Sequence, residues 1–238
     1  MTQPAGPGQS ASRGSESCQS ASRRSARFAA VSVAGALALL IPTAALAEDP
    51  AQWWNAFAGS VKTGIGTIES KGETRLSEGG DINLWNAEVV LMLPAGKRFA
   101  WGPGYKHQEA RLPTSHFIAE ERFLMAGRWS AGKTGAWRWT VRGIVEYREI
   151  EDRPEFWRYR LRPEAKRLIG SSKWEFAASI EGYYDSVRDA YGQNRVQLGV
   201  QRPLDDHTSL SIYYLLRSDR IAGHWEEIQV IGTAWSFR

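Results

Sequence analysis

A strict two-residue alternation of apolar and charged side chains is the feature that most limits the fold of this chain. The stretch AWRWTVRGIVEYREI, residues 136–150, interleaves Trp, Val and Tyr with Arg, Thr and Glu. The same alternation recurs in residues 156–166, 174–185, 194–201 and 209–216. Successive side chains of a β-strand point to opposite faces, whereas a helix repeats its apolar residues every three or four positions. The pattern therefore predicts an all-β chain.

The length of these segments separates the chain from an ordinary soluble sheet. They run for about 10 to 14 residues, where globular strands usually have about five or six. A tilted strand needs about 9 to 11 residues to cross a bilayer. Of the 238 residues, 11 are Trp, a side chain that favours membrane–water interfaces. We therefore predict a transmembrane β-barrel with lipid on the Trp/Val/Tyr side and water on the Arg/Glu side.

The segment boundaries predict an antiparallel barrel of ten strands, with eight as the alternative. Residues 53–68 supply the first strand, and residues 69–81 form the first external loop. Short turns at 94–97, 130–136, 170–173 and 203–206 would face the periplasm, and longer loops at 111–115, 150–155, 185–192 and 218–224 would face outside. A bulge or a misplaced strand boundary is expected at Pro163, because proline cannot donate a hydrogen bond to the neighbouring strand. A bulge is also expected between Val230 and Trp235, where the apolar residues change face.

The first 47 residues read as an N-terminal extension and a cleaved signal peptide. Three arginines precede an apolar run that ends Ala45-Leu46-Ala47, a small-residue cleavage pattern. This leaves residues 48–238 as the barrel domain, without Cys18, which is the single cysteine, and with a net charge near +1 from about 26 basic and 25 acidic residues. A nucleic-acid partner therefore has no support. The exported chain is assigned to the outer membrane of a Gram-negative bacterium, with the soluble periplasm as the alternative.

The alternation also assigns individual residues to faces. The candidates for the lumen lining are Arg122, Arg138, Arg142, Glu146, Arg158, Arg160, Arg162, Glu175 and Glu181. The candidates for the aromatic girdles at the membrane interfaces are Trp129, Trp137, Tyr147, Trp157 and Trp174. Long ionic side chains inside a narrow barrel would pair and fill it, so a packed lumen is favoured over an open pore.

Two motifs resemble those of nucleotide-binding proteins and serine hydrolases, but the residues around them do not support either function. Residues 127–134, GRWSAGKT, match a phosphate-binding loop, but that loop needs a following helix and a strand pattern follows instead. His207 and Ser209 stand close together, as in a base-activated serine hydrolase, but their surroundings are ordinary turn composition. The four histidines are scattered. The sequence predicts no catalytic residues, no metal site and no cofactor.

Several stretches resemble a known family. These are LWNAEVVLMLPAGKRFAW, EERF, EFWRYRLRPEAKR and LGVQRPLDDHTSLSIYYL, within residues 82–238. They are similar to the bacterial domain-of-unknown-function family 2490, whose members are thought to be exported outer-membrane β-barrels. The resemblance implies a barrel and carries over no catalytic residues.

The resulting expectation is a non-enzymatic barrel with a charged, packed lumen and a structural or binding role in the cell envelope. A narrow pore for small solutes or anions is the alternative, and an outer-membrane lipid hydrolase is a further one. The expected partners are outer-membrane lipid and, during insertion, the barrel-assembly machinery. We expect a monomer.

Overall fold

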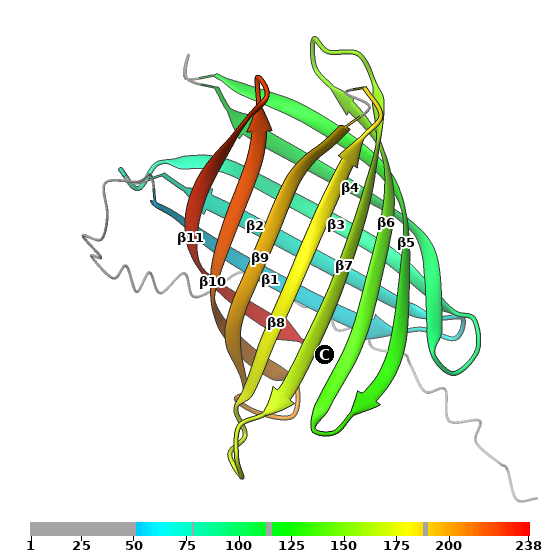
Figure 1. Ribbon diagram of the computed structural model, residues 1–238. Coiled ribbons are helices and arrows are strands. Elements are labelled where there is room, and N and C mark those ends of the chain that lie inside the picture. Colours follow the sequence, from blue (N-terminus) through cyan, green and yellow to red (C-terminus); the bar gives the residue numbers. More distant parts are fainter. Residues whose placement is uncertain (1–50, 78, 113–115, 188–189) are drawn as a thin grey trace, which may run out of the picture. The chain divides into compact units, whose positions relative to one another are not determined.

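The computed structural model describes residues 51–77, 79–112, 116–187 and 190–238, and these are almost entirely β-strand (Figure 1). The strands are β1 Ala51–Lys62, β2 Thr67–Leu76, β3 Ile82–Pro94, β4 Phe99–Arg111, β5 Phe117–Thr134, β6 Trp137–Ile150, β7 Phe156–Leu168, β8 Glu175–Asp185, β9 Ala190–Pro203, β10 Thr208–Ile221 and β11 His224–Phe237. The predicted signal peptide and Cys18 lie outside the described residues. No helix among the described residues is long and apolar enough to cross a membrane.

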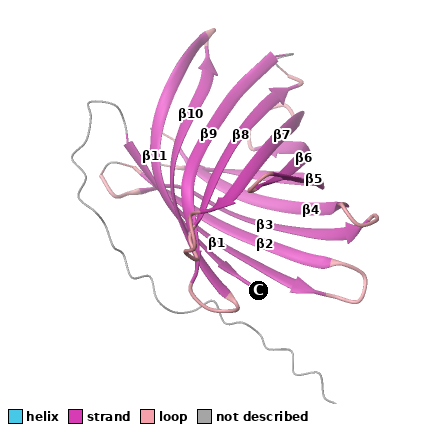
Figure 2. Ribbon diagram, turned by 60° about the horizontal axis from the view of Figure 1, so that its bottom comes forward, coloured by secondary structure: helices cyan, strands magenta, loops and turns pink. Residues whose placement is uncertain are grey.

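The strands close into one barrel in which each pairs with its neighbours in sequence (Figures 1 and 2). All of these pairs are antiparallel, and the barrel closes where β1 runs parallel to β11, with Trp53 beside Ile231 and Phe57 beside Trp235. The described chain therefore has eleven strands, and the predictions of ten and eight are wrong. An odd number of consecutive antiparallel strands can close only through a parallel pair.

The missed strand is β2, which falls in the segment predicted as an external loop. Its inward positions carry Glu69, Lys71, Glu73 and Arg75, and its outward positions carry mostly small or polar side chains. With no Trp, Tyr or Val in alternation, β2 lacks the apolar signal that marks the other strands. Its partners on both sides supply the hydrogen bonds that make it a strand.

The connections at the two ends of the barrel have similar lengths, contrary to the predicted asymmetry. The end that we call the first rim holds residues 63–66, 95–98, 135–136, 169–174 and 204–207. The second rim holds the connections after Leu76, Arg111, Ile150, Asp185 and Ile221. The last of these, predicted as a long loop over 218–224, is only Ala222 and Gly223, both with positive φ, as in a tight hairpin turn.

The outer face carries the apolar set of each strand, and its aromatic side chains form a row. Tyr105 of β4 lies opposite Phe123 of β5, and Phe123 lies opposite Tyr147 of β6. Tyr147 in turn lies opposite Trp157 of β7. The ring centroids of Tyr147 and Trp157 are 5.2 Å apart. Toward the second rim, the next outward position on β5 is Glu121, so an acidic side chain directly follows the aromatic row on this strand.

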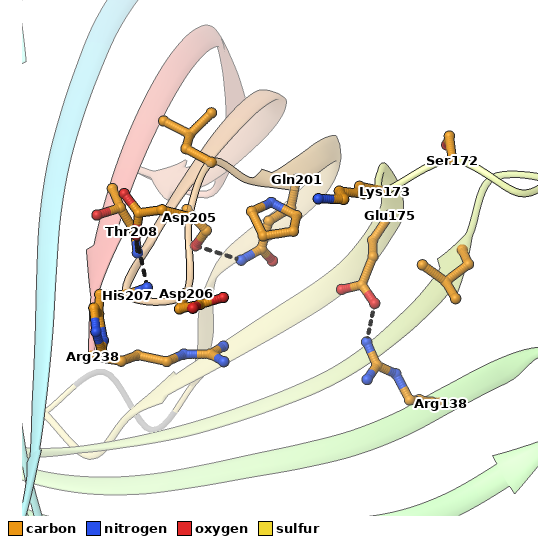
Figure 3. Close-up of a pocket in the computed structure, with 14 residues that line it drawn as sticks. Arg138, Ser172, Lys173, Glu175, Gln201, Asp205, Asp206, His207, Thr208 and Arg238 are labelled. Carbon is orange, nitrogen blue, oxygen red and sulfur yellow. Dashed lines mark hydrogen bonds and ion pairs between the residues drawn. The ribbon is translucent and has the colours of Figure 1, made fainter.

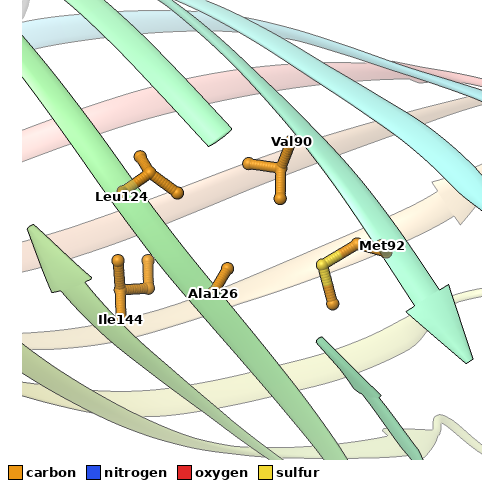
Figure 4. Packing of buried hydrophobic residues seen from close by; sticks show 5 residues of the cluster. All are labelled: Val90, Met92, Leu124, Ala126 and Ile144. Atoms are coloured by element: carbon orange, nitrogen blue, oxygen red, sulfur yellow. The ribbon is translucent and has the colours of Figure 1, made fainter. Parts of the chain in front are cut away.

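Two apolar clusters lie inside the barrel among the charged residues. One gathers Val90, Met92, Leu124, Ala126 and Ile144 from β3, β5 and β6 (Figure 4). The other gathers Trp54, Tyr213, Leu215 and Val230 from β1, β10 and β11.

The second cluster explains the interrupted alternation in β11. Val230 faces inward, Trp235 faces outward, and the pairing with β10 continues without a shift from His224 to Phe237. The bulge predicted there is wrong. The bulge at Pro163 is also wrong, because β7 continues through it with Pro163 opposite Val141.

Candidate functional site

The barrel interior is held by a network of ion pairs centred on Glu146. This carboxylate is fully shielded from solvent and accepts a hydrogen bond from Arg160. Arg122 lies 3.7 Å from its other oxygen. Arg160 also donates to Glu181 at 2.8 Å, so one guanidinium joins carboxylates from β6 and β8. A buried carboxylate and guanidinium are tolerated together because each supplies the other's counter-charge and hydrogen bonds.

The network continues toward the second rim. Glu120 accepts hydrogen bonds from Arg122 at 2.9 Å and from Arg148. Arg158 and Asp185 form a two-bond pair between β7 and β8. The carboxylates of these pairs are almost fully buried, so the charges satisfy one another and not the solvent.

Several contacts join strands that are not neighbours in the sheet. Arg142 of β6 donates to Glu88 of β3 at 3.0 Å. Arg128 of β5 makes two hydrogen bonds to Glu69 of β2, at 2.7 and 2.6 Å. Because these strands are separated by two others, their side chains can meet only across the interior. These contacts close off parts of the lumen.

A further bridge passes through Trp54. The guanidinium of Arg75 on β2 lies 3.7 Å from the ring centroid of Trp54 on β1, and that of Arg195 on β9 lies 5.2 Å from the same ring. Arg195 also lies 4.9 Å from the ring of Tyr183 on β8. Cations within about 6 Å of an aromatic face are attracted to it. The bridge therefore runs from β2 to β8 through the interior.

The structure places all nine predicted lumen candidates on inward positions. Six of them take part in the contacts described above, and a seventh, Arg162, lies 3.1 Å from Glu164. Arg138 and Glu175 pair with each other near the first rim. Sequence analysis missed Trp54, Glu69, Glu73, Arg75 and Glu88, which share the interior. The alternation of charged residues along β2 could have indicated that Glu69, Glu73 and Arg75 face the interior.

The five predicted girdle aromatics lie near the two rims. Trp129 and Trp137 lie toward the first rim, and the ring of Trp137 meets that of Phe176 edge to face at 6.0 Å. Tyr147 and Trp157 lie toward the second rim, in the row already described. Trp174 precedes β8 at the first rim, where Arg202 lies 5.5 Å from its ring.

A polar cavity of about 570 Å³ opens at the first rim (Figure 3). Its lining includes charged side chains of both signs, namely Arg138, Lys173, Glu175, Asp205, Asp206 and Arg238. Asp205 accepts hydrogen bonds from the backbone N–H groups of His207 and Thr208, both at 2.7 Å. These bonds hold the pKa of the Asp205 carboxyl below its ordinary value.

His207 and Ser209 both line this cavity. The Ser209 hydroxyl accepts a hydrogen bond from Gln201 at 3.0 Å, and no hydrogen bond joins it to His207 among the described residues. The phosphate-loop motif continues from β5 into β6 through a tight turn, without a helix. Within the described residues, no group of three His, Cys, Asp or Glu side chains is placed to hold a metal ion.

The fold and the two faces define a class: a closed, mostly antiparallel β-barrel with an apolar exterior and an ion-paired interior. The chain belongs to the family described as "Protein of unknown function (DUF2490)", whose pattern matches residues 51–227. No curated protein matches the sequence.

Two solved structures are similar to part of this chain. One is OmpT, an outer membrane protein of Vibrio cholerae in its trimer form, with 13% identity and a TM-score of 0.38 over 71% of this chain. The other is an anion-selective porin from Comamonas acidovorans, with 10% identity and a TM-score of 0.37 over 73% of this chain. This chain spans 57% and 54% of their respective lengths.

Proposed function

We propose that the protein is an exported outer-membrane β-barrel whose lumen is closed by paired side chains. In this proposal it serves the cell envelope as a structural or binding element, without conducting solutes and without enzymatic activity. Outer-membrane lipid surrounds it.

The outer face supports the membrane part of the proposal. Trp137 and Tyr147 are about ten residues apart on β6, near opposite rims. At about 3.3 Å per residue and a strand tilt of about 40°, they are separated by roughly 25 Å along the barrel axis. Outer-membrane barrels carry an apolar band of about 25 Å between aromatic girdles. The outward residues between them, such as Val141 and Val145, are apolar.

The ion pairs that cross the barrel interior are the observation that carries the closed lumen: Arg142 of β6 with Glu88 of β3, and Arg128 of β5 with Glu69 of β2. Along the wall beside these pairs, Arg160 of β7 joins Glu146 of β6 to Glu181 of β8, and Glu146 is fully buried. Each crossing pair joins two strands that are separated by two others in the barrel. An open pore needs a continuous water-filled path, and these side chains occupy that space.

Conductance in a planar bilayer tests the closed lumen. We expect the purified protein to give no resolvable current steps. Arg142→Ser removes a side chain that crosses the interior to Glu88, and we expect it to produce discrete steps. Arg202→Ser serves as the matched control, because Arg202 lies on the outer face against Trp174 and does not touch the interior network.

Heat-dependent migration on a gel checks that each variant is folded before it is measured. Regular current steps from the unaltered protein would contradict the closed lumen and favour the narrow pore. Recovery of the folded protein from a soluble fraction, with none in the outer membrane, would contradict the location.

A further inference from the structure

An apolar groove lies on the outer wall of the barrel between β4 and β7. Its volume is about 460 Å³. Outward side chains form its sides, namely Phe99, Trp101, Met125, Val145 and Tyr159. Its floor is bare backbone, because Gly127 of β5 lies opposite Gly143 of β6 and neither residue has a side chain. The groove is therefore a gap in the layer of outward side chains.

The floor of the groove separates it from the ionic interior. On the inner face of the same two strands lie Ala126 and Ile144, which belong to the buried apolar cluster (Figure 4). A Cβ atom added to Gly143 would meet only the backbone oxygen of Arg160, at 4.0 Å, which is an ordinary van der Waals distance. The space above Gly143 is therefore open toward the outside and closed toward the inside.

The length of the groove fits within one leaflet of a bilayer. The groove begins beside Phe99, which lies opposite the predicted girdle residue Trp129, and it reaches Met125, four residues from Trp129 along β5. At about 3.3 Å per residue and a strand tilt of about 40°, this distance is roughly 10 Å along the barrel axis. One leaflet of the hydrocarbon core is about 15 Å thick. An acyl chain that starts at the headgroup layer would therefore follow the groove through most of its own leaflet.

Two cations lie at the first-rim end of the groove. Lys97 and Arg98 end the connection between β3 and β4, directly before Phe99. The backbone oxygen of Arg98 accepts a hydrogen bond from the N–H of Ser130 at 2.7 Å, so this connection is held against β5. Both cations are exposed, and no ion pair within the described ranges involves either of them. Their positive charges are therefore available to a headgroup.

The other end of the same wall is acidic. Glu121 of β5 lies opposite Glu149 of β6, two residues beyond the aromatic row. Basic residues near a membrane surface attract anionic lipids, and carboxylates disfavour them. The charges on this wall therefore favour an anionic headgroup at the first rim and not at the second.

We propose that the groove holds one acyl chain of an anionic glycerophospholipid whose phosphate lies against Lys97 and Arg98. The chain fills the gap above Gly127 and Gly143, and the two cations supply the counter-charge in the headgroup layer. One groove beside one pair of cations suits a lipid with a single phosphate, so phosphatidylglycerol is the probe. The inference rests on the membrane location proposed above and names a lipid for one position on the outer wall.

Native mass spectrometry of the full chain released from detergent micelles tests the site. The probes are phosphatidylglycerol and phosphatidylcholine with identical acyl chains. We expect the protein to retain one phosphatidylglycerol, with a preference of about tenfold over phosphatidylcholine. Lys97→Gln combined with Arg98→Gln should remove this preference. Gly143→Leu should lower the retention of both lipids, because the leucine side chain fills the groove.

Lys62→Gln and Ala87→Leu are the matched controls. Lys62 is an exposed cation at the first-rim end of β1, and Ala87 is an exposed outward residue of β3 outside the groove. Both variants should retain lipid as the unaltered protein does. Equal retention of the two lipids by the unaltered protein, or unchanged retention by Gly143→Leu, would overturn the proposal.

Two other occupants of the groove would also overturn it. Stronger retention of lipid A than of phosphatidylglycerol would assign the site to a different anionic lipid. A lipid-free dimer that Gly143→Leu separates would assign the groove to a second copy of the chain.

The membrane location is measured separately, by fractionation and heat-dependent migration. An outer-membrane barrel that shows no lipid preference would refute only this inference. Current steps from a barrel that retains phosphatidylglycerol would refute only the closed lumen.

Discussion

The outer and inner walls of this barrel use the same strands and follow different rules. On the outer wall, each apolar side chain meets its environment by itself, and aromatic neighbours such as Tyr147 and Trp157 add a modest mutual attraction. On the inner wall, the buried negative charge of Glu146 is stabilised by Arg160 and Arg122, which lie on other strands. The comparison shows that the stability of the outer wall depends on each side chain being apolar. The stability of the inner wall depends on specific ion pairs between side chains of different strands.

The adjacent residues Trp53 and Trp54 of β1 should show the largest difference in stability between the two walls. Trp54 faces inward at 2% exposure under the guanidinium of Arg75, whereas Trp53 faces outward. Trp54→Ala should lower the free energy of unfolding by about 3–5 kcal/mol, because it leaves a cavity and removes the cation–π contact. Urea unfolding in micelles, followed by circular dichroism, measures the loss.

Trp53→Ala is the control on the outer wall. In micelles it should cost about 1 kcal/mol or less, because detergent fills the space that the ring leaves. If both variants lose the same free energy, the assignment of the two walls on β1 does not hold.

An arginine placed on the outer wall should produce the next largest effect. Leu161 is 59% exposed and pairs with Gly143, about midway between the two rims. Leu161→Arg should lower the stability in a bilayer by about 2–4 kcal/mol, as expected for a cation near the lipid midplane. Folding titrations in lipid vesicles measure this change.

The matched substitution outside the apolar band is Val187→Arg, in the connection after β8. Val187 is exposed at the second rim, so the arginine there remains in water and should change the stability by about 0–1 kcal/mol. Equal costs at both positions would mean that Leu161 does not face lipid.

The smallest effect is expected at the first rim, where Asp205 caps its own turn. Because the pKa of Asp205 is lowered in the folded protein, its contribution is present above the ordinary Asp pKa of about 3.9 and is lost as the pH falls through the lower folded value. The amide proton shifts of His207 and Thr208 should therefore titrate below about pH 4 in NMR spectra.

Asp205→Asn keeps an acceptor oxygen without the charge. We expect its turn amides to remain hydrogen-bonded and to show no such titration. A titration that persists in this variant would assign the pH dependence to another group.

The sequence predicted the strands whose outer face is rich in Trp, Tyr and Val, and it placed the nine lumen candidates on inward positions. It failed at β2, whose outer face is small and polar, and so the strand count was wrong. It also failed at Val230, because an apolar residue on the inner wall breaks the alternation as a bulge would. Both failures have one cause. Sequence periodicity reveals a strand only when its two faces differ in hydrophobicity, and this difference is weak in β2 and reversed at Val230.

The sequence by itself determined the all-β class and the separation of apolar and ionic faces, because alternation is a local property of the chain. It could not say which face is inside, since both arrangements have the same period. Only the tertiary structure decided that the ionic face lines the interior, that β1 closes on β11 in parallel, and which carboxylate each arginine binds. The Arg142–Glu88 pair spans 54 residues of sequence, and its formation depends on barrel closure, which no local pattern encodes.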